Sequence, residues 1–241
     1  MLAFKRGFPF YLFMAVLMIV VNVIGFAPSY FLKPLFNYPE LPFSTHVHGI
    51  LFTGWFVLFF TQVLLIRKGK IRIHKQLGII GAILALFMFI SGTLIIYFRT
   101  LEFTGTAGSL QNTALVVSGN IMLLFMFVMF TGLGIVYRER ADWHKRFMLL
   151  ACVSMMPQSL GRFGRLPIPS INESVPNEVF FGVGGMVFFI LLIWTHELIQ
   201  FKRLHLISFI GGPFMFAMII FGAIILPGTG LMKEMIIWIN S

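Results

Sequence analysis

Four of the six histidines in this sequence are placed where they can do chemistry together. His74, His144 and His205 each lie beside basic residues at the start of an apolar run, in the segments IRIHKQLG, ADWHKRFM and FKRLHLIS. His196, followed by Glu197, lies at the end of another apolar run. A neutral imidazole nitrogen binds zinc, copper or iron. The pattern predicts that these four histidines lie at one depth, near one face of a membrane.

Histidines at one depth permit two kinds of cofactor site. Three of them can form a His₃ metal site, with candidate ligands His74, His144, His205 and His196. Alternatively, His74 and His144 can clamp a b-type haem from two facing helices. Gly78 and Gly81 follow His74 by four and seven residues, which leaves one helix face nearly bare for a planar cofactor or a close neighbouring helix. The third interpretation is that each histidine is an ordinary, partly solvated interfacial residue.

A second group of polar residues lies on one apolar helix. His48, Phe52, Trp55, Phe59 and Gln62 follow one another in steps of 4, 3, 4 and 3, so they form a single stripe. The stripe places Gln62 at the depth of the histidine cluster and His48 at the other face of the membrane. His48 and Gln62 therefore join His74 and His144 as candidate cofactor-binding residues. His46 can share a ligand with His48 only if the chain before His48 is extended.

The elements that position these residues are membrane helices. Apolar residues make up 59% of the 241 positions and charged residues only 11%, against about 25% in soluble domains. The formal charge of +10 lies in short loops, where lysine and arginine set membrane topology, so we expect no nucleic-acid partner. No polar segment is long enough for a separate soluble domain. Residues 1–241 are predicted to be one membrane domain in contact with the lipid bilayer.

Seven apolar runs predict an all-α, polytopic membrane protein with seven transmembrane helices. The runs cover about residues 10–32, 47–66, 76–98, 114–137, 146–161, 179–200 and 204–226, near the expected length of about 20 residues. The fifth is short and contains Pro157. The tail from Leu231 is too short to span and is predicted to lie along the membrane surface.

Charge counting orients these helices. The N-terminus and the loops after the second, fourth and sixth runs hold 13 of the 18 lysines and arginines, and the opposite side holds 5. By the positive-inside rule, the N-terminus is predicted to be cytoplasmic and the C-terminus outside.

Several classes of membrane protein are disfavoured by the sequence. The run 204–226 has no lysine, so a retinal Schiff base has no attachment point there. The acidic residues lie in loops or at helix ends, so a carboxylate proton relay across the bilayer is not expected. Walker, GxSxG and HExxH motifs do not occur.

One short motif order resembles a known family. The pattern H-x₁₃-Q-x₁₁-H-K-x-x-G at His48, Gln62, His74 and Gly78, followed by H-K-R-F-M at His144, resembles an uncharacterised family of bacterial multi-pass inner-membrane proteins. Members of that family carry a histidine–glutamine helix, then HR-x-x-G, then HRR-x-M. The resemblance covers about residues 45–165 and implies roles for these residues without implying an activity. A more distant similarity is to diheme transmembrane b-type cytochromes, and it implies an inner haem between His74 and His144.

These patterns predict a multi-pass protein of the bacterial inner membrane that binds haem or a transition metal (zinc, copper or iron) in membrane redox chemistry. A membrane quinone or an oxidase-type complex would be its electron partner. Two alternatives stay open at the level of sequence. One is a zinc-dependent enzyme that modifies lipids, and the other is a cofactor-free accessory or assembly subunit of a larger membrane complex.

Overall fold

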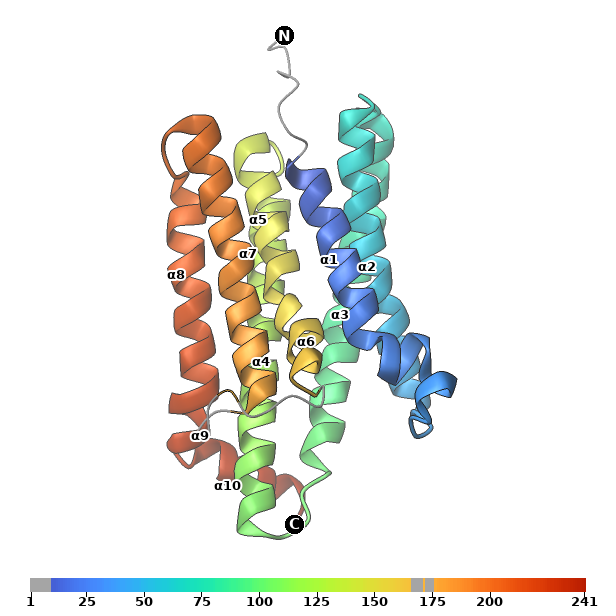
Figure 1. Cartoon of the computed structure of the whole chain (residues 1–241), viewed down its shortest axis with the longest axis vertical. Helices are drawn as coiled ribbons and strands as arrows, with labels where there is room; N and C mark the ends of the chain where they lie inside the picture. The colour runs from blue at the N-terminus through green and yellow to red at the C-terminus, as the bar shows by residue number, and fades with distance from the viewer. Residues whose placement is uncertain (1–9, 166–170, 172–175) are drawn as a thin grey trace.

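The computed structural model describes residues 10–165, 171 and 176–241, and within them every regular element is helical. Long helices run nearly parallel to one axis of the molecule, and short helical segments connect them (Figure 1). The elements in chain order are α1 (Phe10–Phe26), η1 (Ala27–Phe31), η2 (Lys33–Phe36), α2 (Phe43–Arg67), α3 (Ile71–Thr100), α4 (Ala107–Val136), α5 (Ala141–Ser154), α6 (Met156–Leu160), η3 (Gly161–Arg165), α7 (Asn177–Phe201), α8 (Leu206–Ile220), η4 (Phe221–Ile225), α9 (Leu226–Gly228) and α10 (Leu231–Ile239).

Six helical stretches are long and apolar enough to cross a membrane. They are Phe10–Phe31, Phe43–Arg67, Ile71–Thr100, Ala107–Val136, Asn177–Phe201 and Leu206–Gly228. Many large apolar side chains on these stretches point out of the bundle and are exposed, for example Ile79, Val136 and Ile199. A soluble protein rarely exposes so much contiguous apolar surface. The protein is therefore an all-α integral membrane protein whose outer surface suits contact with lipid.

The predicted fifth run, 146–161, differs from the other six. The structure divides it into α5 and α6, which lie one after the other in the middle of the bundle (Figure 1). The break falls at Met155, two residues before Pro157 in the first turn of α6. A proline ring lacks an N–H and collides with the carbonyl four residues earlier, so it ends the preceding helix. More than half of the α5 residues are buried, including the charged Arg146.

Three of the other helices begin earlier than predicted: α3 begins at Ile71 rather than near residue 76, α4 begins at Ala107 rather than near residue 114, and α2 also begins early. Helix α2 begins at Phe43, directly after Pro42, rather than near residue 47. His46 and His48 are therefore already helical and point in different directions. At the far end of the chain, α10 packs against the first part of α4, where Met232 and Ile236 meet Ala114 and Val117.

The core is built mostly from phenylalanine and methionine, and a glycine permits a close contact between α1 and α6. Asn22 of α1 and Ser159 of α6 are buried and joined by a hydrogen bond of 2.9 Å from the Ser159 hydroxyl to the Asn22 side-chain oxygen. One turn later, Gly25 lies so close that an added Cβ would collide with the Ser159 backbone carbonyl. The buried hydrogen bond and the absence of a side chain at Gly25 thus allow α1 and α6 to pack closely.

Candidate metal site

His74 and His144 lie side by side at the end of the bundle where α3 and α5 begin. Their ring centroids are 6.1 Å apart and the ring planes are nearly perpendicular, at 83°. Each histidine lies in the first turn of its helix, after a short basic loop. Two of the predicted ligands are therefore brought together by helices that are not consecutive in the chain.

The protonation of His144 is fixed by a backbone group of α4. Its Nδ1 lies 2.8 Å from the carbonyl oxygen of Gly134. A carbonyl oxygen only accepts hydrogen bonds, so Nδ1 must carry the proton and donate it. The neutral ring then has its free lone pair on Nε2. A histidine held in this way, through the nitrogen that does not bind metal, is the usual arrangement of a metal ligand.

Gln62 of α2 joins the pair, as the predicted stripe requires. A Cβ added at Gly78, one turn after His74, would lie 3.8 Å from the Gln62 amide nitrogen, so α2 and α3 meet at this level. Gln62 Oε1 and His74 Nδ1 are both buried, and neither has a hydrogen-bond partner among the described residues. A buried polar atom without a partner costs about 1–3 kcal/mol. A bound ion that accepts a lone pair from each of these two atoms would remove this cost.

The other two predicted ligands, His205 and His196, are engaged elsewhere. His205 precedes α8, and its Nδ1 accepts a hydrogen bond of 3.3 Å from the backbone N–H of Ile207. His196 stacks on Phe10 of α1, with ring centroids 3.9 Å apart and planes parallel within 1°. Among the residues that the structure describes, no three His, Cys, Asp or Glu side chains are grouped closely enough to hold a metal ion. Any metal at this end would therefore be bound by His74, His144 and a neutral donor such as Gln62.

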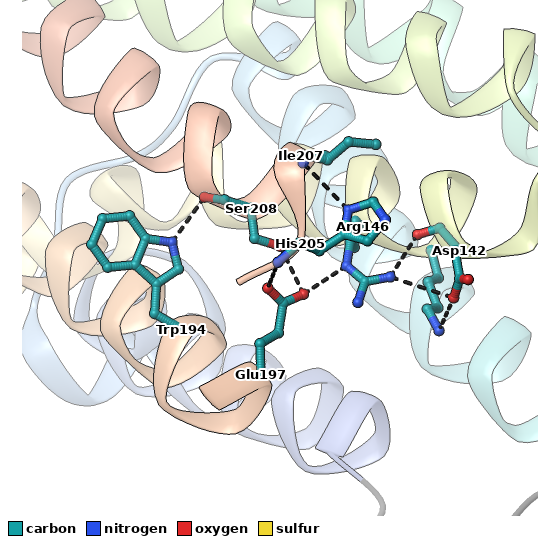
Figure 2. Close-up of polar contacts among 8 residues, drawn as sticks. Asp142, Arg146, Trp194, Glu197, His205, Ile207 and Ser208 are labelled. Carbon is teal, nitrogen blue, oxygen red and sulfur yellow. Dashed lines mark hydrogen bonds and ion pairs between the residues drawn. The ribbon is translucent and has the colours of Figure 1, made fainter. Parts of the chain in front are cut away.

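His205 instead belongs to a buried ionic cluster that joins α5, α7 and α8 (Figure 2). Glu197 accepts hydrogen bonds from Arg146 Nε at 2.6 Å, from the Ser208 hydroxyl at 2.9 Å and from the His205 backbone N–H at 2.9 Å. Arg146 Nη1 also donates to the backbone carbonyl of Asp142, at 2.9 Å. The side chains of Arg146 and Glu197 are only 5% and 3% exposed. Glu197 and Arg146 find their hydrogen-bond partners within the cluster, which holds the three helices together.

At the opposite end, His46 and His48 are both half-buried and make different contacts. His48 Nδ1 lies 3.1 Å from the hydroxyl of Ser91 in α3, and this hydroxyl in turn donates to the carbonyl of Met88. The Ser91 oxygen therefore accepts from His48, so its ring also carries its proton on Nδ1. His46 lies beside Tyr30, whose hydroxyl donates to the His46 carbonyl at 3.1 Å. His48 and the His74–His144 pair lie toward opposite ends of α2 and α3.

The stripe between His48 and Gln62 is the core-facing side of α2. Phe52, Trp55 and Phe59 are all buried, and Trp55 packs edge-on against Phe127 of α4 with centroids 5.0 Å apart. Aromatic side chains thus fill the space between the two polar ends of α2. This packing makes the stripe a structural element with a candidate ligand at each end.

Comparisons with known proteins identify no relative of this chain. No family model, curated protein or solved structure matches the chain. The resemblance to bacterial inner-membrane proteins and to diheme cytochromes accordingly stays a prediction. What the site can do must be inferred from its own atoms.

Sequence reasoning missed the acceptor for His144 and the partner of Arg146. The carbonyl of Gly134 has no sequence signal, because any backbone carbonyl at that point would serve. The pairing of Arg146 with Glu197 did have a signal. Both are charged residues within or beside apolar runs, and such residues need a partner at membrane depth.

Proposed function

We propose that this protein binds one transition-metal ion between His74 and His144, with Gln62 as a third donor, and uses it in redox chemistry inside the membrane. The observation that carries this proposal is the pair of rings 6.1 Å apart. Two imidazoles that share one metal ion have centroids about 5–6 Å apart, because each metal–nitrogen bond is about 2.0–2.1 Å and the centroid lies about 1 Å further on. The separation therefore suits one ion.

The donor set favours a metal ion over a haem. Two imidazoles and an amide oxygen suit copper, iron or zinc. Copper or iron would supply one-electron chemistry, with a membrane quinone or an oxidase-type complex as electron partner. With zinc, the protein would instead be a hydrolytic enzyme acting on lipid.

The proposed topology has seven crossings, with a cytoplasmic N-terminus. Two observations support it: the 13-to-5 distribution of lysine and arginine, and the position of α5 and α6, which together run between the end of α4 and the start of α7 (Figure 1). This places His74 and His144 near the cytoplasmic face. Cys152 is completely buried, so it should not react with a maleimide. Labelling of the variants Lys68→Cys and Thr104→Cys then comes from the introduced cysteine alone. An impermeant maleimide should label only Thr104→Cys in intact cells. Labelling of Lys68→Cys alone would show that the protein has the opposite orientation.

The decisive experiment is metal analysis, with a reduced-minus-oxidised visible spectrum, on protein purified in mild detergent. We expect about one copper or iron per chain, lost in His74→Ala and in His144→Ala and weakened in Gln62→Leu. His196→Ala is the matched control, because His196 lies at the same end but stacks on Phe10. One zinc ion per chain, with no visible absorption, would refute the redox function and favour the zinc-dependent lipid-modifying enzyme. Metal content unchanged in both His74 and His144 variants would refute the site.

A further inference from the structure

A cavity lies at the end of the bundle away from His74 and His144. It has a volume of about 210 Å³, is open on one side and is lined by residues of α4, α6, η3, α7, α8 and η4. Apolar side chains such as Leu115, Leu123 and Val183 form much of its wall. Its polar lining consists of Asn120, Gln158, Arg162, Arg165 and Glu178. An apolar cavity with a few convergent polar groups is the usual form of a small-molecule site.

Two amides form the polar part of the wall inside the membrane region. The side-chain nitrogen of Gln158 donates to the side-chain oxygen of Asn120 at 2.6 Å. This bond uses only one polar atom of each amide. The Asn120 nitrogen and the Gln158 oxygen take no part in it, so a donor and an acceptor are available beside the cavity.

Arg162 is held in place without a carboxylate partner. Its Nη1 donates to the backbone carbonyl of Gln158 at 2.6 Å, and its guanidinium carbon lies 3.7 Å from the centroid of the Phe26 ring. Among the described residues, no carboxylate lies within 4.0 Å of Arg162. A largely buried charge without a counter-charge is costly, so an anion at this position would be stabilised.

Arg165 adds a second positive charge to the same cavity. It is half exposed and pairs weakly with Glu178, whose carboxylate oxygen lies 3.9 Å from Arg165 Nε. Burial lowers the pKa of Arg162 to about 10, and the charge of Arg165 contributes to the shift. The guanidinium is still charged at neutral pH. Two arginines against one carboxylate in the lining give the cavity a positive excess.

We propose that this cavity binds an anionic amphiphile, with its oxyanion head group paired to Arg162 and Arg165 and its apolar chain against Leu123 and Val183. Guanidinium groups favour carboxylate and phosphate oxygens because several N–H donors face them at once. The volume is below the roughly 300–1,000 Å³ of sites for drug-sized ligands. The cavity therefore accommodates the head group and the first part of the chain, while the remainder of the chain lies in the bilayer.

The test is equilibrium binding of radiolabelled dodecanoate to the full-length protein in phosphatidylcholine nanodiscs, corrected with empty nanodiscs. We expect saturable binding that is displaced by unlabelled dodecanoate and not by dodecanol, which has the same chain without the charge. Phosphatidylglycerol included in the nanodiscs identifies the source of the ligand. Competition by this lipid would indicate a phospholipid head group, and its absence a free fatty acid. Displacement by dodecanol or by inorganic phosphate as strong as by dodecanoate would overturn the proposal.

Two pairs of variants test whether dodecanoate binds in this cavity. Arg162→Gln should weaken dodecanoate binding about tenfold or more. Arg99→Gln should leave it unchanged, because Arg99 pairs with Glu102 and lies outside the cavity. Gly119 lines the cavity and a Cβ added there meets nothing within 4 Å, so Gly119→Leu fills the space without a backbone clash.

The matched control for the filled cavity is Gly132→Leu, on the same helix and equally open, but not part of the lining. We expect Gly119→Leu to abolish dodecanoate binding and Gly132→Leu to preserve it. If Arg162→Gln does not fold, the Gly119 and Gly132 pair still decides the question. Equal binding by Gly119→Leu and Gly132→Leu would refute the cavity as the binding site.

Discussion

Arg146 Nε donates to Glu197 Oε1 over 2.6 Å, and both side chains are almost completely withdrawn from solvent. This contact joins α5 to α7, and the Ser208 hydroxyl extends it to α8. Because each charge is buried, removing one of them leaves the other without a partner. The pair therefore controls whether three helices stay packed at this end.

We expect Glu197→Gln to destabilise the protein by about 3–5 kcal/mol, because it leaves the buried Arg146 charge uncompensated. The double variant Arg146→Met with Glu197→Leu should recover much of that loss, since both charges are replaced by apolar groups. Thermal unfolding in detergent measures both. A double variant less stable than Glu197→Gln alone would show that the charges act independently.

The capping role of His205 predicts a dependence of stability on pH. Burial lowers the pKa of His205, and Arg146 lowers it further, against smaller opposing effects of Glu197 and Asp142. The unfolded chain, with a histidine pKa of about 6.5, then binds more protons than the folded one between the two pKa values. Stability contributed by His205 is therefore full above about pH 6.5 and is lost as the pH falls through the folded pKa.

The variant His205→Asn tests this dependence, because asparagine still accepts a hydrogen bond at the start of a helix but does not titrate. Its melting temperature should fall less than that of the parent between about pH 7.5 and 5. Asp142 does not interfere in this range. A hydrogen bond from Lys145 lowers the pKa of Asp142, so its effect lies at more acid pH. An unchanged pH profile in His205→Asn would show that other groups cause the acid sensitivity.

The contact between α1 and α6 predicts a difference between two glycines. Gly25→Ala places a Cβ against the backbone carbonyl of Ser159, which cannot rotate away, so α1 must move. We expect a loss of about 1–3 kcal/mol, as for overpacked cores. Gly108→Ala, where an added Cβ meets nothing within 4 Å, should be neutral or stabilising. Equal melting temperatures for the two variants would contradict the close approach.

The start of α4 is held by a side-chain cap. The hydroxyl of Thr106 accepts from the backbone N–H of Ser109 at 3.2 Å, and the Ser109 hydroxyl accepts from the backbone N–H of Thr104 at 3.1 Å. Thr106→Ala should cost about 0.5–2 kcal/mol, whereas Thr106→Ser should cost little. Chemical unfolding in detergent compares the two. A serine variant as unstable as the alanine variant would mean that the methyl group, not the cap, matters.

Much of the fold was predictable because the bilayer restricts it. Every helix that meets lipid must be long and apolar, so hydropathy alone located six helices, although α3 begins at Ile71 rather than near residue 76 and α4 at Ala107 rather than near residue 114. Helix α5 was the weakest prediction because protein, rather than lipid, surrounds it. Its start at Ala141 lies in a stretch with Asp142 and Lys145 that hydropathy assigns to a loop.

The candidate site was predictable only in part, for a geometric reason. The depth of a residue in the membrane follows from its position along a helix. The sequence therefore predicted that His74, His144 and Gln62 lie at the same depth, and in the structure they lie near one another. The angular position of each helix around the bundle does not follow from depth. His205 and His196 therefore matched the pair in depth and yet lie in other contacts, against Glu197 and Phe10.

The enclosure of α5 has a consequence for how the protein is made. A segment is inserted from the translocon according to its own hydrophobicity, and a charge such as Arg146, in the second turn of α5, opposes insertion. With 14 residues, α5 is too short to be inserted alone. Its entry would have to wait until α7 has been synthesised and Glu197 can neutralise Arg146. The nascent chain would thus hold α5 at the membrane surface until the C-terminal third emerges from the ribosome.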